Sequence, residues 1–385
     1  MEKLVYCDHS ATTYIKDEVL NEMLPYLKYN FGNASSNYSL GRISKKALET
    51  SRSKIASIIN ANPEEIYFTS GGSESDNLIV SGIARKYKSK GKHIITSKFE
   101  HLALLNTCKN LESEGFEISY IDVDNSGMVK IDELEKAIRD DTILISIMYV
   151  NNEVGTIQNI DKISSIAKKN GIFFHTDAVQ ALGNVNIDVK NQNIDLLSMS
   201  AHKFYGPKGV GISYIRSGIE FEPLIYGGHQ EKCKRAGTEN VAGIVGAAKA
   251  LEIASMSINY HNEKMREFRD MFLYNLNANN DKILINGSMK NRIPANLNIF
   301  FEGIDSQTML SLLDMNGICA SSGSACNSSV VTPSHVLTSM HIPSKIANNS
   351  IRFTFGEANN KEQIRFLSYV VCNILKDVKN GKYLK

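Results

Sequence analysis

The sequence predicts an α/β fold, with a largely parallel β-sheet covered by helices. Short apolar runs, each too short for a core helix, recur between residues 65 and 215, and charged, helix-like stretches separate most of them. This alternation is typical of parallel sheets whose strands are connected by helices. At 385 residues the chain also exceeds the usual size of a single core, so we expect one large domain and a smaller one.

The first predicted element is a helix over residues 41–60, and Asn62-Pro63-Glu64 then indicates a new start. Apolar residues recur near a helical period in this stretch: Ile43, Ala47, Leu48, Ile55, Ile58 and Ile59. The strand-like runs follow in order: 65–70 (EIYFTS), 93–97 (HIITS), 143–150 (ILISIMYV), 172–177 (IFFHTD), 195–200 (DLLSMS) and 210–215 (VGISYI).

Polar residues follow most of these runs. Ligands bind beyond the carboxyl ends of the strands in such sheets, so these positions are candidates for a functional site. Five clusters are expected to converge on one crevice: residues 71–74 (GGSE), 100–101 (EH), 151–153 (NNE), 175–177 (HTD) and 201–203 (AHK).

Charge and composition exclude several functional classes. The 43 basic and 41 acidic residues leave a net charge of +2, which provides no electrostatic basis for binding nucleic acid or a membrane surface. No segment approaches the roughly 18 to 20 apolar residues of a membrane span, and we expect a cytoplasmic protein. The six cysteines are scattered without a CxxC pair or zinc-ligand spacing, so neither a disulfide framework nor a metal site is expected.

The stretch Gly71–Asp76 leads from a strand into an apolar helix-like segment, with Ser73 and Asp76 spaced as a capping box. A glycine turn at a helix N-terminus offers free N–H groups and the positive end of the helix dipole to a phosphate group. Taken alone, the stretch also fits an ordinary capped helix.

Asp177 is expected at the end of a strand and near a helix start, where a lone aspartate is usually a cap. Lys203 follows an apolar strand and lies between His202 and Phe204, which is an unusual setting for a solvated cation. Removing its amine from water would lower the pKa and favour Schiff-base chemistry.

These motifs resemble those of the cysteine desulfurases of the NifS and IscS type. The resemblance rests on SMSAHKFYGPKGVG (198–211), with HTDAVQ (175–180) upstream and RAGTEN (235–240) downstream. It extends from Tyr6–Thr13 to Ser350–Phe353, so it covers nearly the whole chain. These enzymes belong to the class V aminotransferase-like branch of fold-type I proteins, which depend on pyridoxal 5'-phosphate (PLP).

The resemblance implies a large PLP-binding domain over residues 14–255 with a mostly parallel seven-stranded sheet. The smaller α/β domain would comprise residues 1–13 and 256–385. It also implies a role in cofactor binding for each of nine residues. Lys203 would bind PLP covalently, Asp177 would pair with the pyridine nitrogen, and His101 would stack on the ring and transfer protons. Asn152 and Gln180 would form hydrogen bonds on the phenolic oxygen side, and the phosphate would be bound by Gly72, Ser73, Ser200 and His202. Thr238 would reach the phosphate of the other subunit, which implies a homodimer with shared active sites.

Cys326 lies among small and polar residues, in the segment from about 321 to 337, which predicts an exposed and reactive thiol. The segment resembles the group I desulfurase signature, in which this cysteine accepts sulfur from L-cysteine as a persulfide and leaves L-alanine. The sulfur would pass to an acceptor protein such as an iron–sulfur scaffold. Arg352 matches the residue that binds the substrate carboxylate, together with Asn152; alone, it would be assigned to a surface ion pair.

Several positions depart from the usual family pattern: His9-Ser10, Tyr38 and the stretch Tyr226–Lys234. Cys233 in that stretch is either a tolerated loop substitution or a second redox-active thiol. Two alternative activities also fit the same scaffold. A selenocysteine lyase would keep Lys203 and Asp177, and so would an aminotransferase, which has no need of Cys326.

Overall fold

The computed structural model describes residues 4–278, 283–323 and 333–382. Its central element is a seven-stranded sheet with the strand order β2-β8-β7-β6-β5-β3-β4. The strands are β2 (Ile66–Thr69), β3 (His93–Ser97), β4 (Glu117–Ile121), β5 (Thr142–Ser146), β6 (Phe173–Asp177), β7 (Leu196–Ser200) and β8 (Gly211–Ile215). Six of them coincide with the predicted apolar runs. The prediction missed β4, a half-exposed edge strand that lacks a continuous apolar run.

Strand direction confirms the mostly parallel sheet. Strands β7, β6, β5, β3 and β4 run parallel, whereas β8 is antiparallel to both of its neighbours, β7 and β2. Strand β2 therefore runs in the same direction as β7. As a result, the carboxyl ends of β2, β3, β5, β6 and β7 all lie at one edge of the sheet.

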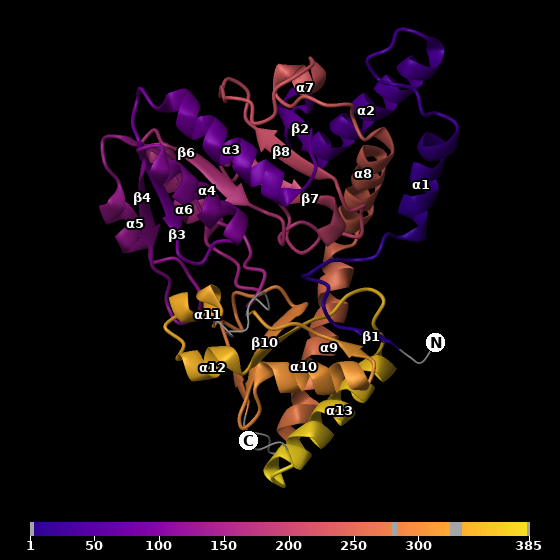
Figure 1. Cartoon of the computed structure of the whole chain (residues 1–385), viewed down its shortest axis with the longest axis vertical. Coiled ribbons are helices and arrows are strands. Elements are labelled where there is room, and N and C mark those ends of the chain that lie inside the picture. Colours follow the sequence, from indigo (N-terminus) through magenta and orange to yellow (C-terminus); the bar gives the residue numbers. More distant parts are fainter. Residues whose placement is uncertain (1–3, 279–282, 324–332, 383–385) are drawn as a thin grey trace.

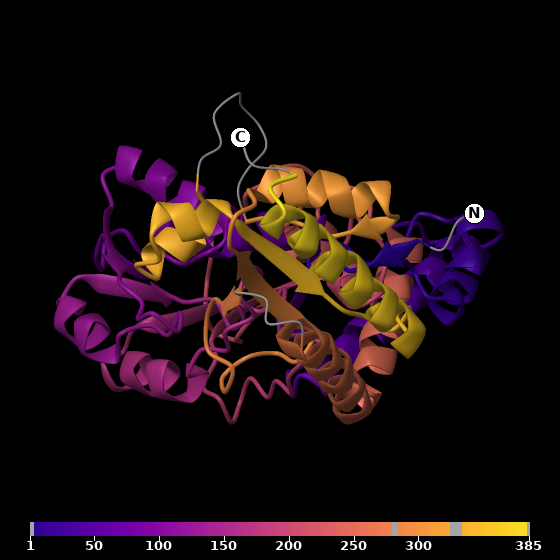
Figure 2. The same ribbon diagram turned by 90° about the horizontal axis from the view of Figure 1, so that it is seen from below.

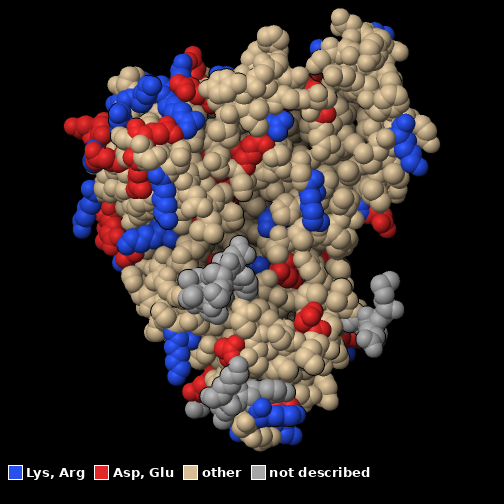
Figure 3. Space-filling view, viewed as in Figure 1, with Lys and Arg blue, Asp and Glu red and all other residues tan. Residues whose placement is uncertain are grey.

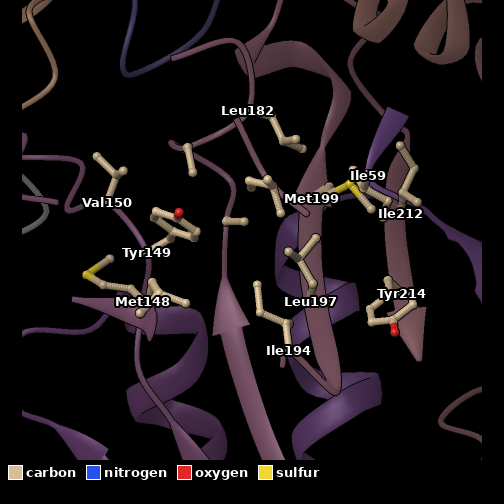
Figure 4. Packing of buried hydrophobic residues seen from close by; sticks show 14 of the residues in the cluster. Ile59, Met148, Tyr149, Val150, Leu182, Ile194, Leu197, Met199, Ile212 and Tyr214 are labelled. Atoms are coloured by element: carbon tan, nitrogen blue, oxygen red, sulfur yellow. The ribbon is translucent and has the colours of Figure 1, made fainter. Parts of the chain in front are cut away.

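Helices cover both faces of this sheet (Figure 1). Successive residues of each strand alternate between two apolar clusters, with Leu144 and Leu196 in one and Ile145 and Leu197 in the other. The second of these clusters is shown in Figure 4. The helices of this part are α1 (Asp17–Lys28), α2 (Ser39–Ile58), α3 (Gly72–Tyr87), α4 (Leu102–Ser113), α5 (Ile131–Ala137), α6 (Ile160–Lys169), α7 (Gln230–Cys233) and α8 (Val241–Met256).

A third apolar cluster combines the start of the chain with its last third, from Val5 to Val378. It surrounds a small antiparallel sheet of order β12-β10-β9 and a two-stranded parallel pair, β1 and β11 (Figures 1 and 2). The elements are β1 (Val5–Tyr6), β9 (Ile283–Ile285), β10 (Asn296–Phe301), β11 (Ile318–Cys319), β12 (Ser350–Thr354), α9 (Ile258–Ala278), α10 (Ser306–Met315) and α13 (Lys361–Lys379).

The distribution of core residues supports a division near residues 14 and 255, which stays a prediction. Two short helices differ from that division in their packing. Helices α11 (His335–Ser339) and α12 (Ser344–Asn348) contribute apolar side chains, such as Leu337, to the cluster on the large sheet.

Three local predictions are corrected by the structure. The helix expected over residues 41–60 is α2, which runs from Ser39 to Ile58. The new start expected at Asn62-Pro63-Glu64 is confirmed, because Asn62 is the N-cap residue of a short 3-10 helix, η1 (Pro63–Glu65). Ser73 and Asp76 form no capping box, because α3 already begins at Gly72 and Asp76 is buried within it. A turn, not a helix, follows Asp177.

Charged side chains of both signs are intermixed on the face shown in Figure 3, as the balanced composition suggests. Within the described ranges, no single helix has the length and apolar character of a membrane span; only α8 and α9 taken together do, and they are bent by 71°.

A buried ion pair holds the stretch Tyr226–Lys234 against the large sheet. Glu231 accepts two hydrogen bonds from Arg52, at 2.7 and 2.9 Å, and one from the backbone N–H of Phe68 at 2.8 Å. Both charged side chains are buried. Glu231, Lys232 and Cys233 all have left-handed backbone angles, with φ from 44° to 65°, so this contact also stabilises a strained turn.

We expect the Glu231→Gln variant to lower the free energy of unfolding by about 3 kcal/mol, because it leaves the Arg52 charge buried without its partner. Urea denaturation measures this change. Glu49→Gln is the matched control, since the Glu49 carboxylate also contacts Arg52 but is 53% exposed; its cost should stay below about 1 kcal/mol. Equal costs for the two variants would contradict the assignment.

Candidate active site

The carboxyl ends of the co-directional strands surround a cavity of about 250 Å³. Nine of the predicted cofactor residues line it: Gly72, Ser73, His101, Asn152, Asp177, Gln180, Ser200, His202 and Lys203. They come together because β2, β3, β5, β6 and β7 end at the same edge of the sheet. The cavity therefore brings together residues that are up to 131 positions apart, from Gly72 to Lys203.

The amino group of Lys203 points to the N-terminal segment of the chain. Its Nζ donates hydrogen bonds to the carbonyl oxygens of Ser10 and Ala11, at 2.5 and 2.7 Å. Gln180 donates to the same Ser10 oxygen at 2.9 Å. Burial lowers the pKa of Lys203 to about 8; the positive charge of Arg352 acts in the same direction, and two carboxylates oppose it. About a tenth of this amine is thus uncharged at pH 7, far more than for an ordinary lysine.

Asp177 ends strand β6, and one of its oxygens accepts a hydrogen bond from the backbone N–H of Val179 at 2.9 Å. Burial raises the pKa of Asp177, while electrostatic interactions with His101 and Lys203 oppose this shift. Asp76 also lines the cavity, and its pKa is raised by burial and then by the charge of Asp177. A positively charged group in the cavity would therefore be stabilised by Asp177.

His101 is the N-cap residue of α4, and its Nδ1 accepts a hydrogen bond from the N–H of Ala103 at 3.1 Å. A neutral ring with this bond carries its proton on Nε2. The preceding residue, Glu100, is fully buried and accepts hydrogen bonds from Ser97 and the backbone of Met148. Burial raises the pKa of Glu100 to about 8, because these donors only partly replace water.

The end of the cavity at α3 has the features of a phosphate site. The first-turn N–H groups of a 16-residue helix begin at Gly72, and Ser73, Ser200 and His202 lie beside them. A Cβ atom at Gly72 would lie only 2.7 Å from Cγ2 of Val179, so a larger residue would close this space. His202 is held through its Nδ1, 3.0 Å from the hydroxyl of Thr12. These residues fit a compact anionic group.

Arg352, on strand β12, lies near Lys203 but comes from the other part of the chain. It forms an ion pair of 2.7 Å with Asp8 and donates a hydrogen bond to the backbone oxygen of Asn152 at 3.1 Å. Ser321 donates to the second Asp8 oxygen at 2.6 Å. Since Arg352 is only 7% exposed, its assignment to a surface ion pair is wrong. Its Nε has no hydrogen-bond partner among the described residues, so the guanidinium keeps donor capacity for an anion.

Two of the described predicted residues, Arg352 and Thr238, do not line this cavity. Thr238 is exposed and does not contact the cavity of its own chain. Cys326 lies outside the described residues. The roles of all the predicted residues stay predictions at this point.

The unusual positions lie in different environments. His9 is buried, with Nδ1 2.9 Å from the backbone oxygen of Thr354, and Tyr38 is exposed at the start of α2. Cys233 is exposed, with its sulfur 3.2 Å from Nδ1 of His229.

The sequence reasoning assigned no role to several residues that shape the site. Asp8 pairs with Arg352, and the carbonyls of Ser10 and Ala11 hold Lys203. Asp76, expected only as part of a capping box, lines the cavity and interacts electrostatically with Asp177. Glu100 and Glu153 were each part of a predicted polar cluster, and this was the only signal for them. All these residues act through contacts between distant parts of the chain, which spacing in the sequence does not reveal.

Comparison with known proteins agrees with this geometry. Residues 5–367 match the family Aminotransferase class-V. The chain is 52% identical to a cysteine desulfurase IscS from Methanosarcina thermophila, over 98% of this chain and 93% of that protein. It is 50% identical to a cysteine desulfurase IscS from Clostridium botulinum, over 98% and 95% of the two chains.

Two solved structures extend the similarity to three dimensions. A NifS-like protein has a TM-score of 0.92 and 38% identity, over 97% of this chain and all of that one. A structure described as SspA in complex with cysteine has a TM-score of 0.82 and 37% identity, over 91% and 99% of the two chains. With fold, cavity and sequence in agreement over nearly its whole length, the chain belongs to the class-V aminotransferase family, alongside relatives named cysteine desulfurases.

Proposed function

We propose that this protein is a PLP-dependent cysteine desulfurase, which converts L-cysteine to L-alanine and holds the sulfur as a persulfide on Cys326. The observation that carries the proposal is the buried pair of Lys203 and Asp177 in one cavity, with Arg352 beside them. Relatives with the name cysteine desulfurase, at 50 to 52% identity, support the choice of reaction.

The cavity residues fit PLP on chemical grounds. When bound, PLP supplies an electron-withdrawing ring that stabilises negative charge on the substrate carbon. Lys203 would hold the cofactor covalently through its uncharged amine, and Asp177 would keep the ring nitrogen protonated. The start of α3, with Ser200 and His202, would bind the phosphate group. Asn152 and Gln180 would donate their amide hydrogens to the phenolic oxygen side.

The substrate would be oriented by Arg352 and deprotonated by Lys203 or His101. The planar guanidinium of Arg352 suits a carboxylate, and its contact with the Asn152 carbonyl fixes it next to the cofactor site. Lys203 is well suited to move a proton, because its pKa of about 8 lies close to neutral pH.

Sulfur transfer would use the thiolate of Cys326. This thiolate attacks the sulfur of the substrate, so that a new S–S bond forms while the C–S bond breaks. The electron pair of the C–S bond stays with the carbon, which takes up a proton and ends as alanine. L-Cysteine and one thiol thus give L-alanine and one persulfide, with no other reactant.

The proposal includes a homodimer, a sulfur acceptor and a cytoplasmic location. Exposed apolar side chains between Leu20 and Ile43, together with an exposed Thr238, support a second copy of the chain that shares the site. The acceptor would be a protein such as an iron–sulfur scaffold. The five described cysteines form no disulfide, which suits a reducing compartment.

The reaction is tested by measuring alanine and sulfide release from L-cysteine in the presence of a reductant. Cys326→Ala and Lys203→Ala should each lower alanine formation by at least about 100-fold, because one removes the sulfur acceptor and the other the cofactor anchor. Cys326→Ala should keep the yellow colour of bound PLP.

Two other outcomes would redirect the assignment. Full activity of Cys326→Ala on selenocysteine but not on cysteine would indicate a selenocysteine lyase. Transfer of the amino group to a keto acid, with no alanine from cysteine, would indicate an aminotransferase.

Covalent binding of PLP to the protein without cofactor should accelerate as the pH rises, with a midpoint near 8, because only the uncharged Lys203 amine reacts. The growth of the yellow absorbance after PLP is added measures this rate. The same series with N-acetyl-lysine corrects for ionisation of PLP itself. A midpoint near 10.5, the ordinary value for lysine, would show that burial does not lower the pKa of Lys203.

Arg352→Lys should raise KM for L-cysteine by about tenfold or more, because an ammonium group keeps the charge but loses the two-pronged geometry. Cysteamine, which lacks the carboxylate, provides the control, since its binding should change little. Steady-state kinetics with both compounds measure this selectivity. Equal effects on the two compounds would exclude a carboxylate-binding role for Arg352.

A further inference from the structure

The buried carboxyl group of Glu153 has no role in the reaction described above. Glu153 follows Asn152 in the turn beyond strand β5 and is only 6% exposed. Its backbone is fixed on both sides: the N–H donates to Oδ1 of Asn151 at 2.8 Å, and the carbonyl accepts from the amide of Asn298 at 3.3 Å. The direction of its side chain is therefore set by the turn that also presents Asn152 to the cavity.

This carboxyl group contacts two segments of the chain at once. Ser334, the N-cap residue of α11, donates its hydroxyl to Oε2 of Glu153 at 2.5 Å. Gly323 packs directly against the same oxygen. A Cβ atom at position 323 would overlap Oε2 of Glu153 and would lie 3.0 Å from Cβ of Ser334. Gly323, Glu153 and Ser334 thus meet at one point, and a side chain at position 323 would have to displace the Glu153 carboxyl group.

These two segments are the described flanks of residues 324–332, which carry Cys326. Cys326 follows Gly323 by three residues, so the position of Gly323 limits where the thiol can go. Holding both flanks together also removes conformational freedom from the chain between them. The preceding segment is fixed independently, because Ser321 pairs with Arg352 of β12 through two backbone hydrogen bonds of 2.6 and 3.2 Å.

The hydrogen bond is costly to lose in this environment. Burial raises the pKa of Glu153 to about 7, and the Ser334 hydroxyl and the Arg352 charge act in the opposite direction. A carboxyl group removed from water needs such a donor whether or not it is charged, since an unsatisfied buried polar group is destabilising. This requirement favours keeping Ser334 in place.

We propose that Glu153 is a positioning residue for sulfur transfer: its carboxyl group binds the Ser334 hydroxyl and packs against Gly323, and so fixes the two described flanks of the segment that carries Cys326. The inference rests on the proposed desulfurase function. Glu153 contributes no atom to the reaction. It acts by raising the local concentration of the Cys326 thiol at the substrate sulfur.

The test compares Glu153→Ala, Ser334→Ala and Glu153→Gln with the unmodified holoenzyme. Glu153→Ala and Ser334→Ala should lower kcat for alanine formation about tenfold or more, since small misplacements of a reacting group have large effects on rate, while KM for L-cysteine stays within about twofold. Glu153→Gln keeps an oxygen that accepts from Ser334, so it should retain most of the activity. The visible spectrum of bound PLP should be the same in all of them.

A second measurement needs no turnover. The rate at which iodoacetamide alkylates Cys326, followed by mass spectrometry of its peptide, should change at least about threefold in Glu153→Ala and Ser334→Ala, because the flanks of that peptide are released. Glu65→Gln is the matched control: this buried carboxylate accepts hydrogen bonds from Asn62 and Ser217, far along the chain from residues 321–337. It should leave both kcat and the alkylation rate unchanged.

Three results would overturn the inference. One is an alkylation rate and a kcat in Glu153→Ala equal to those of the unmodified protein. Another is a loss in Glu153→Gln as large as in Glu153→Ala, which would assign the effect to charge. A third is a change in Glu65→Gln as large as in Glu153→Ala. Failure of the unmodified protein to form alanine would instead refute the proposed function, and the alkylation rates would still decide whether Glu153 positions Cys326.

Discussion

The strands of the large sheet share one direction, except β8, which is antiparallel to both of its neighbours. The carboxyl ends therefore lie at one edge of the sheet for β2, β3, β5, β6 and β7. The chain leaves each of these strands at the same side of the molecule. Polar residues that would be unfavourable inside the sheet are placed there, around a cavity that is lined by residues between Gly72 and Lys203. The rest of the site depends on this arrangement.

Burial at that edge changes the acid–base properties of the groups it collects. Removal from water raises the pKa of Asp177, Asp76 and Glu100 and lowers that of Lys203. Burial causes both shifts, because it disfavours the charged form of an acid and of an amine alike. The pKa values of the acids and of the Lys203 amine therefore move toward neutral pH. A cavity of this kind is suited to proton transfer, whereas the same residues on an exposed surface would stay fully charged.

The N-terminal segment connects the two parts of the molecule across the cavity. Asp8 pairs with Arg352 of β12, while the carbonyls of Ser10 and Ala11 accept hydrogen bonds from Lys203. Glu153 makes a comparable connection from the other side, through Ser334. The groups expected to bind cofactor, substrate carboxylate and sulfur are thus tied to one another through a few buried polar contacts, which explains why residues from both ends of the chain are needed.

The amino-acid sequence by itself determined the α/β class, six of the seven strands of the large sheet and seven residues that line the cavity, because apolar runs and the polar residues after them are local patterns. Two further lining residues, Gln180 and Ser200, were expected only from the family resemblance. Tertiary structure alone decided the partners of those residues. The pairing of Asp8 with Arg352, the carbonyls that hold Lys203 and the contact of Glu153 with Gly323 and Ser334 join positions far apart in the chain. Local spacing contains no information about such contacts, since they form only when strand direction and packing bring distant segments together.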